Sequence, residues 1–160
     1  MPSNRRENGL DDANLRLLAE LQQDARLSFA ELGRRVGLSS PAVAERVARL
    51  EETGVIKGYR AEVDPRAVGW ALSVVIRIRP APRELTKVAE LAQRTPEIVE
   101  CHRVTGEDCY IMRAHVREVE DLEELIDRFA AYGQTTTSLI HSSPVTLRDP
   151  PLELRPPADA

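Results

Sequence analysis

Residues 28–56 read SFAELGRRVGLSSPAVAERVARLEETGVI, and this stretch decides the fold of the first part of the chain. Apolar residues recur three or four positions apart on both sides of a Gly-Leu-Ser turn, which is the spacing of two short amphipathic helices. The apolar positions are Leu32, Val36, Leu38, Val43, Val47 and Leu50. Two such helices joined by a short turn are typical of a helix-turn-helix.

The residues in and around the turn support this interpretation. Gly37 can adopt the positive φ that ends the first helix, and either Ser39 or Ser40 can cap the second one. Pro41 fits a first helical turn, where its missing N–H would have no partner in any case. Glycine inside a helix costs about 1 kcal/mol relative to alanine, so Gly33 predicts a close approach of the two helices.

The second helix of such a motif enters the major groove of DNA. With the apolar stripe buried, we expect Ala42, Glu45, Arg46 and Arg49 to face outward. A corner of two helices also occurs in proteins that bind no DNA, and exposed arginines are often only solvated, so the motif alone leaves that alternative open. The complete expected interface with double-stranded DNA is Arg34, Arg35, Ser39, Ser40, Pro41, Ala42, Glu45, Arg46 and Arg49.

Charge is distributed unevenly along the 160 residues, whose formal net charge is −4. Residues 1–60 hold 10 basic and 9 acidic residues, whereas residues 61–160 hold 12 and 17. Residues 31–60 alone hold 6 and 4, a net charge of +2. The expected N-terminal DNA-binding domain (residues 10–57, called the head) thus contains a weakly basic stretch, and the second part of the chain is acidic. This distribution fits local contact with DNA better than extensive coating of it. Aromatic residues make up only 4%, too few to stack many single-stranded bases.

The chain shows no sign of secretion or membrane insertion. Residues 1–9 are polar and precede no apolar run, so we expect no signal peptide. No stretch approaches the roughly 20 apolar residues that cross a bilayer. Two cysteines make no disulfide framework. We therefore expect a cytoplasmic protein with no membrane partner.

Periodicity and turn residues predict an α+β chain with two domains. A helix over 10–24 completes a three-helix or winged helix-turn-helix domain, and 56–63 looks extended. After it the order is β-α-β-β-α-β, the ferredoxin-like pattern: 71–79, 83–94, 98–105, 108–116, 118–132 and 134–143, with a tight turn at 106–107. The expected domains are a flexible N-terminus (1–9), the DNA-binding domain (10–57), a tether (58–69), the ferredoxin-like domain (70–145) and a Pro-rich tail (146–160).

Apolar residues on both faces of the central strands bear on assembly. Val75 lies on the face opposite Val74 and Ile76, and two helices cover only one face of such a sheet. The open face therefore favours sheet-to-sheet dimerisation. Scattered apolar residues on a solvated face are the alternative.

Many short matches in the right order give a family resemblance over roughly residues 10–145. They are Leu10-Asp11, Asp24-Ala25-Arg26, Glu31-Leu32, Val36-Gly37-Leu38-Ser39, Arg46-Val47, Arg49-Leu50, Gly54-Val55-Ile56, Gly58-Tyr59, Pro96-Glu97-Ile98-Val99-Glu100 and Val104-Thr105-Gly106. With the predicted layout, they make the chain similar to the leucine-responsive regulatory protein (Lrp/AsnC) family of transcription regulators.

The resemblance implies a DNA-binding regulator whose second domain dimerises and senses a small effector, usually an amino acid. Dimers would bind a pseudo-palindromic operator and commonly associate into octamers, with the effector between dimers. The implied effector residues are Val104, Thr105, Gly106, Asp108, Thr135, Thr136 and Thr137. Family members often have Gly-x-x-Asp where this chain has Gly106-Glu107-Asp108-Cys109, so the aspartate is shifted by one residue and Cys109 takes its place. Asn14 stands where aspartate is frequent, and Gln134 where valine is.

Four residues raise the question of other chemistry. Cys101, His102, Cys109 and His115 lie on neighbouring strands, but they lack metal-ligand spacing, so we expect buried structural cysteines, no metal and no cofactor. An enzyme similar to haem-biosynthesis decarboxylases, or a metabolite-binding module without DNA binding, are the alternative functions. The predicted Ser39–Arg49 surface argues against the enzyme, and we expect no enzymatic activity. Salt-sensitive DNA binding would exclude the metabolite-binding module, because phosphate contacts make affinity fall with salt.

Overall fold

The computed structural model describes residues 10–152, and it divides the chain into two compact units. The first contains the N-terminal helices up to Ala61, and the second spans Glu62–Thr146. The predicted flexible N-terminus and the part of the Pro-rich tail after residue 152 lie outside the described residues.

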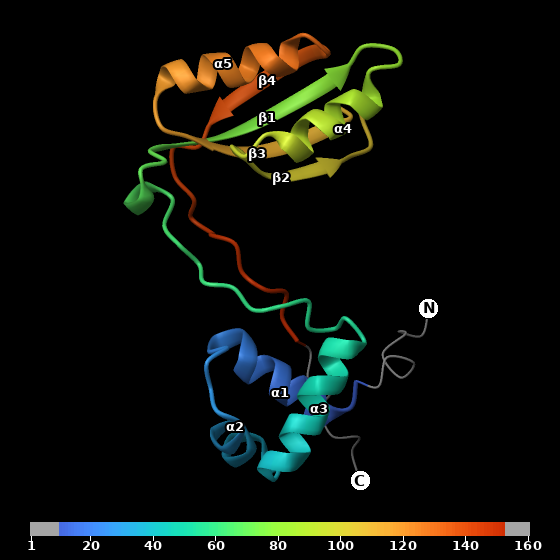
Figure 1. The fold of residues 1–160 in the computed structure, drawn as a ribbon, viewed down its shortest axis with the longest axis vertical. Coiled ribbons are helices and arrows are strands. Elements are labelled where there is room, and N and C mark those ends of the chain that lie inside the picture. Colours follow the sequence, from blue (N-terminus) through green and yellow to red (C-terminus); the bar gives the residue numbers. More distant parts are fainter. Residues whose placement is uncertain (1–9, 153–160) are drawn as a thin grey trace. The chain divides into compact units, whose positions relative to one another are not determined.

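Three helices form the first unit: α1 (Asp12–Gln23), α2 (Phe29–Val36) and α3 (Ser40–Glu52) (Figure 1). Each begins at a side-chain cap: Asp11 for α1, Ser28 for α2 and Ser39 for α3. The cap of α3 is therefore Ser39 and not Ser40. Gly37 ends α2 with φ 77°, as predicted. Because residues 10–71 contain no strand, the unit is the three-helix form and has no wing.

The predicted apolar stripe forms the core of the first unit. Its buried members come from all three helices: Leu17, Leu32, Val36, Val43 and Val47. Four partly buried side chains pack against them: Leu21, Leu27, Leu38 and Ile56. Burying these side chains is the main favourable term that holds the short helices together, since none is long enough to be stable alone.

Within residues 10–152, the predicted tether pairs with no β-strand. Residues 57–64 adopt no regular structure, and a single 3₁₀ turn follows at Arg66–Val68. The start of this segment is attached to the head, because the Tyr59 hydroxyl donates a 2.8 Å hydrogen bond to Glu51 at the end of α3. Burial and the Glu51 carboxylate raise the pKa of Tyr59 to about 12. The phenol is therefore a proton donor throughout the physiological range.

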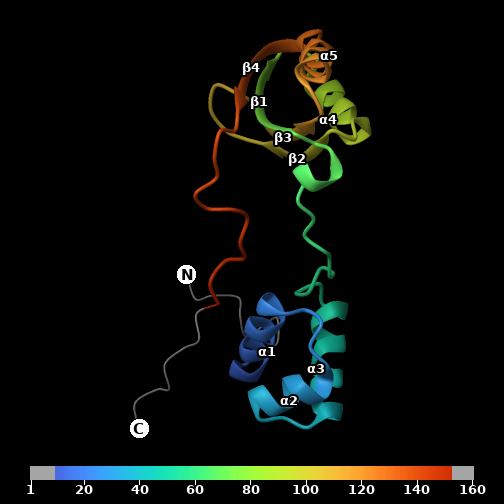
Figure 2. The same cartoon turned by 90° about the vertical axis from the view of Figure 1, so that its left-hand side faces the viewer.

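The second unit is a four-stranded antiparallel sheet in the order β2-β3-β1-β4, which is the ferredoxin-like topology (Figure 1). Its elements are β1 (Leu72–Pro80), α4 (Leu85–Arg94), β2 (Ile98–Arg103), β3 (Tyr110–Val116), α5 (Val119–Ala130) and β4 (Gly133–Leu139). Both helices lie on one side of the sheet, and the other face is open (Figure 2). Fully buried side chains between sheet and helices include Val74, Ile76, Ile78, Met112 and Phe129.

The hairpin between β2 and β3 differs from the predicted tight turn. A two-residue turn at 106–107 would pair Cys101 with Met112, and this register is present: Cys101 pairs with Met112, and the Val104 amide donates to the Cys109 carbonyl. The strands, however, end at Arg103 and start again at Tyr110, which leaves a loop over residues 104–109. Cys101 is exposed on the edge strand, so the prediction of two buried cysteines is wrong for it.

The Gly33 position tests the packing of the first unit. A Cβ built there would overlap the carbonyl oxygen of Leu38. We expect Gly33→Ala to lower the free energy of unfolding of this unit by about 1–3 kcal/mol, despite the better helix propensity of alanine. Hydrogen exchange of the α2 and α3 amides measures it. Gly37→Asn is the control, because that position has open space and asparagine tolerates positive φ; equal stability of the two variants would contradict the close packing.

Candidate nucleic-acid interface and effector loop

The exposed side of α3 follows directly from the buried side. Because Val43, Val47 and Leu50 face the core, Glu45 and Arg49 are exposed to solvent. Ser39, Ser40 and Pro41 are also exposed at the start of the helix, where Ser39 accepts a hydrogen bond from the Ala42 amide. A helix N-terminus with exposed hydroxyls and an arginine one to three turns later can hold phosphate and reach a base edge.

Arg46 faces outward only in part. Its guanidinium donates to the Asp11 carboxylate at 2.7 Å and to the Asn14 side-chain oxygen at 3.0 Å. Burial raises the pKa of Asp11, but hydrogen bonds from Asn14 and Arg46 outweigh it and lower the pKa. Arg46 therefore joins α3 to α1. Ala42 is also half-buried, so two of the four residues predicted to face out do so only in part.

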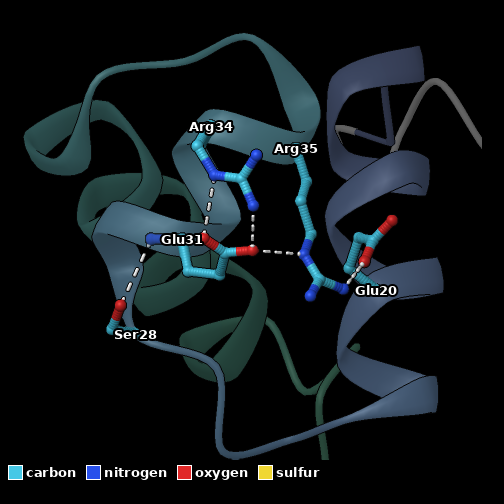
Figure 3. Close-up of polar contacts among 5 residues, drawn as sticks. All are labelled: Glu20, Ser28, Glu31, Arg34 and Arg35. Atoms are coloured by element: carbon cyan, nitrogen blue, oxygen red, sulfur yellow. Dashed lines mark hydrogen bonds and ion pairs between the residues drawn. The ribbon is translucent and has the colours of Figure 1, made fainter.

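Arg34 and Arg35 share one carboxylate, that of Glu31 (Figure 3). Arg34 lies 2.6 Å from Glu31, and Arg35 lies 2.8 Å both from Glu31 and from Glu20 on α1. Hydrogen bonds from the two arginines lower the pKa of Glu31 from 4.5 to about 2. The pairing therefore stabilises the head above about pH 4.5 and is lost as the pH falls towards 2.

The two arginines of this cluster are not equivalent. Arg35 joins α2 to α1, as Figure 3 shows, and its side chain is 39% exposed. In the described part of the chain, Arg34 bonds only within its own helix, and its side chain is 74% exposed. Arg34 can exchange Glu31 for a phosphate at little cost, because exposed ion pairs are weak. Within residues 10–152, Arg49 forms no ion pair at all and is the most available cation of α3.

The loop over residues 104–109 is attached to the sheet at its base. The Val104 amide donates to the Cys109 carbonyl, and the Cys109 amide donates to the Ile78 carbonyl on β1. At the tip, Gly106 has φ 116°, a conformation that other residues rarely adopt. The base thus fixes where Thr105, Gly106 and Asp108 lie, and Gly106 sets how the tip turns.

The three predicted threonines of β4 do not share a face. Thr135 pairs with Ile78 and Thr137 with Ile76, so both lie on the side that the helices cover. Thr136 pairs with Arg77 on the open face. The Thr137 hydroxyl is buried and has no hydrogen-bond partner in the described part of the chain. A single ligand on one side of the sheet could contact Thr136 or the other two, but not all three.

Sequence reasoning missed one residue at the loop, Arg79 of β1. Its guanidinium donates to the Glu107 carbonyl at 2.8 Å and to the Glu107 carboxylate at 3.0 Å. The two residues are 28 positions apart, and only the sheet order places β1 beside β3. No local pattern could have found this contact.

The cysteine and histidine side chains of the sheet do not converge on a metal site. In residues 10–152, no three His, Cys, Asp or Glu side chains are grouped to hold a metal ion. Cys101 and His102 are exposed on β2, and His102 lies 2.8 Å from Glu100. His115 is 2.8 Å from the Ser73 hydroxyl instead.

Within residues 10–152, the helices are too short or too polar to span a membrane.

Comparisons with known proteins agree with this geometry. An AsnC-type helix-turn-helix domain matches residues 10–51, and an Lrp/AsnC ligand binding domain matches residues 73–149. LrpC of Bacillus subtilis, an HTH-type transcriptional regulator, is 36% identical over 133 residues, covering 83% of this chain and 92% of LrpC. The regulator LrpA of Mycobacterium tuberculosis is 36% identical over 80% of this chain and 86% of its own length.

Solved structures give the same result over the whole fold. The structure of B. subtilis LrpC superposes with a TM-score of 0.81 and covers 86% of this chain and 99% of that one. A complex of the regulator NMB0573 with L-Met, from Neisseria meningitidis, gives 0.84 at 25% identity, covering 89% and 97%. These relatives are named as regulators and not as enzymes. The chain belongs to the Lrp/AsnC family of DNA-binding transcriptional regulators, with a helix-turn-helix domain and a ligand-binding domain.

Proposed function

We propose that the chain reads a pseudo-palindromic operator through α3 and that an amino acid controls it. The observation that carries the DNA part is the exposed side of α3. It presents hydroxyls, a carboxylate and the Arg49 guanidinium on a helix whose other side is fixed by Val43 and Val47. Such a regulator acts where the DNA is, so we assign it to the cytoplasm.

The residues of the head divide into two roles. Ser39 and Ser40 bind phosphate, Arg49 reads a guanine edge and Glu45 accepts from a cytosine amino group. Arg34 adds a phosphate contact when it leaves Glu31. Two further residues position the helices and do not read bases: Arg35 and Arg46.

Two heads are needed because one head carries little positive charge. The open face of the sheet can pair them: Val75 and Ile111 are half-buried at its centre, with Arg77, Arg113 and Ser138 around them. Packing two such faces buries the apolar centre and makes a two-fold dimer. Its heads would contact half-sites about 34 Å apart, or a multiple of that distance. Association into octamers stays a prediction from the family.

The effector part rests on the loop over residues 104–109 and on the family's ligand-binding domain. A structural neighbour is described in complex with L-Met, which supports an amino acid as the ligand class. The bend at Gly106 exposes backbone groups around Thr105 and Asp108 that can bind ammonium and carboxylate. Thr136 is the β4 threonine on the open face, and the helix-covered Thr135 and Thr137 can take part only from the other side.

Arg49→Ala tests the DNA interface. We expect specific binding to the protein's own promoter fragment to weaken by about 1–3 kcal/mol, because a bidentate contact to a base is lost. Gel retardation at several salt concentrations measures it, with unchanged melting as the check on folding. Arg94→Ala, on α4 in the second unit, is the matched control. Arg46→Ala should instead lower the melting temperature, since it separates α3 from α1. Unaltered retention by Arg49→Ala would contradict the proposed interface.

A thermal-shift screen with the twenty amino acids, combined with light scattering, tests the effector. We expect one or two amino acids to raise the melting temperature and to change assembly size. Gly106→Ala should lose both responses and keep DNA binding, because alanine strains the loop at φ 116°. If no amino acid has an effect while DNA binding is intact, the protein is an effector-independent regulator.

A further inference from the structure

The tip of the loop over residues 104–109 is held by a single side chain. In the described residues, Arg79 provides the only hydrogen bonds to Thr105–Asp108: Nε donates to the Glu107 carbonyl and Nη2 to its carboxylate. The base of the loop is fixed separately by the backbone bond from Cys109 to Ile78, the residue before Arg79. Arg79 therefore controls the tip alone.

The backbone of Arg79 is fixed by close packing. It pairs with Gln134 at the start of β4, and a Cβ on the neighbouring Gly133 would overlap the Arg79 carbonyl. The side chain lies on the open face, which it shares with Arg77, because residues two apart on a strand point the same way. A fixed backbone with a half-exposed guanidinium is a preorganised site for a planar carboxylate.

The Glu107 carboxylate on this guanidinium is easy to displace. Its side chain is 91% exposed, and that of Arg79 is 49% exposed. Exposed ion pairs are weak since both partners remain hydrated. The second contact, from Nε to the Glu107 carbonyl, does not depend on the carboxylate. Another carboxylate can therefore take the place of the Glu107 side chain while the loop stays attached.

We infer that Arg79 docks the carboxylate group of the effector, and that the Glu107 carboxylate competes with it for this position. This inference rests on the proposed amino-acid control and adds the group that recognises the ligand. Ligand binding exchanges one ion pair for another and releases the Glu107 side chain. When the effector is bound, the Glu107 side chain is therefore free, while its carbonyl still holds the loop to Arg79. The exchange also makes the free carboxylate, and not the amide, the required form of the effector.

Titration calorimetry on the full chain tests the exchange. The probes are the amino acid with the largest thermal shift and its carboxamide, beginning with L-methionine and L-methioninamide. We expect the wild type to prefer the free acid by about tenfold or more. Glu107→Gln should tighten binding of the acid about two- to fivefold and leave the carboxamide unchanged.

Arg79→Gln should abolish the preference for the acid, and Arg79→Lys should restore part of it. A purely structural clamp would weaken acid and carboxamide alike. Arg94→Gln is the control, an exposed arginine of α4 with no ion pair in residues 10–152, and it should retain the wild-type preference. Equal binding of acid and carboxamide by the wild type overturns this inference and leaves the effector proposal standing. If neither the wild type nor Glu107→Gln binds any amino acid, both are overturned.

Discussion

The close packing of α3 on α2 is the constraint on which the DNA-binding head depends. Gly33 has no side chain, and so the turn at Leu38, just before α3, can lie against α2, while Val43 and Val47 are buried in the core. Once these contacts fix the rotation of α3, Glu45 and Arg49 can only face solvent. The proposed DNA-reading surface is thus a consequence of burial and not of any preference of the exposed residues themselves.

Ion pairs within the head reduce the charge that it can offer to DNA. Arg35 and Arg46 each join a helix to α1, and Glu31 holds Arg34 as well. The pairs of Arg35 and Arg46 connect helices that are too short to be stable alone. They also leave the net charge of +2 over residues 31–60 only weakly attractive to phosphate. We therefore propose that affinity comes from two heads that act together, joined through the open sheet face of the second unit.

Local patterns were enough to predict most of the fold. Caps, apolar spacing and turn glycines depend on near neighbours, and they located the helices and the register of Cys101 against Met112. Side-chain pairs between distant residues were not predictable. Arg46 reaches Asp11 and Arg79 reaches Glu107 only because packing brings their elements together. The β4 threonines are a different case: alternation along a strand already separates Thr136 from Thr135 and Thr137, and pairing with β1 decides only which of them lie on the open face. The proposed interfaces with DNA and effector therefore rest on the few residues that remain accessible after these pairs form.

An Ile111→Glu variant tests most directly whether DNA binding depends on paired heads. Its affinity for the promoter fragment is measured, and light scattering in the same buffer gives its oligomeric state. This substitution places a charge at the centre of the open face, while the head lies in the other unit. We expect a monomer with folded heads that binds the promoter fragment weakly and without sequence preference. Full specific affinity in a variant shown to be monomeric would contradict the need for two heads.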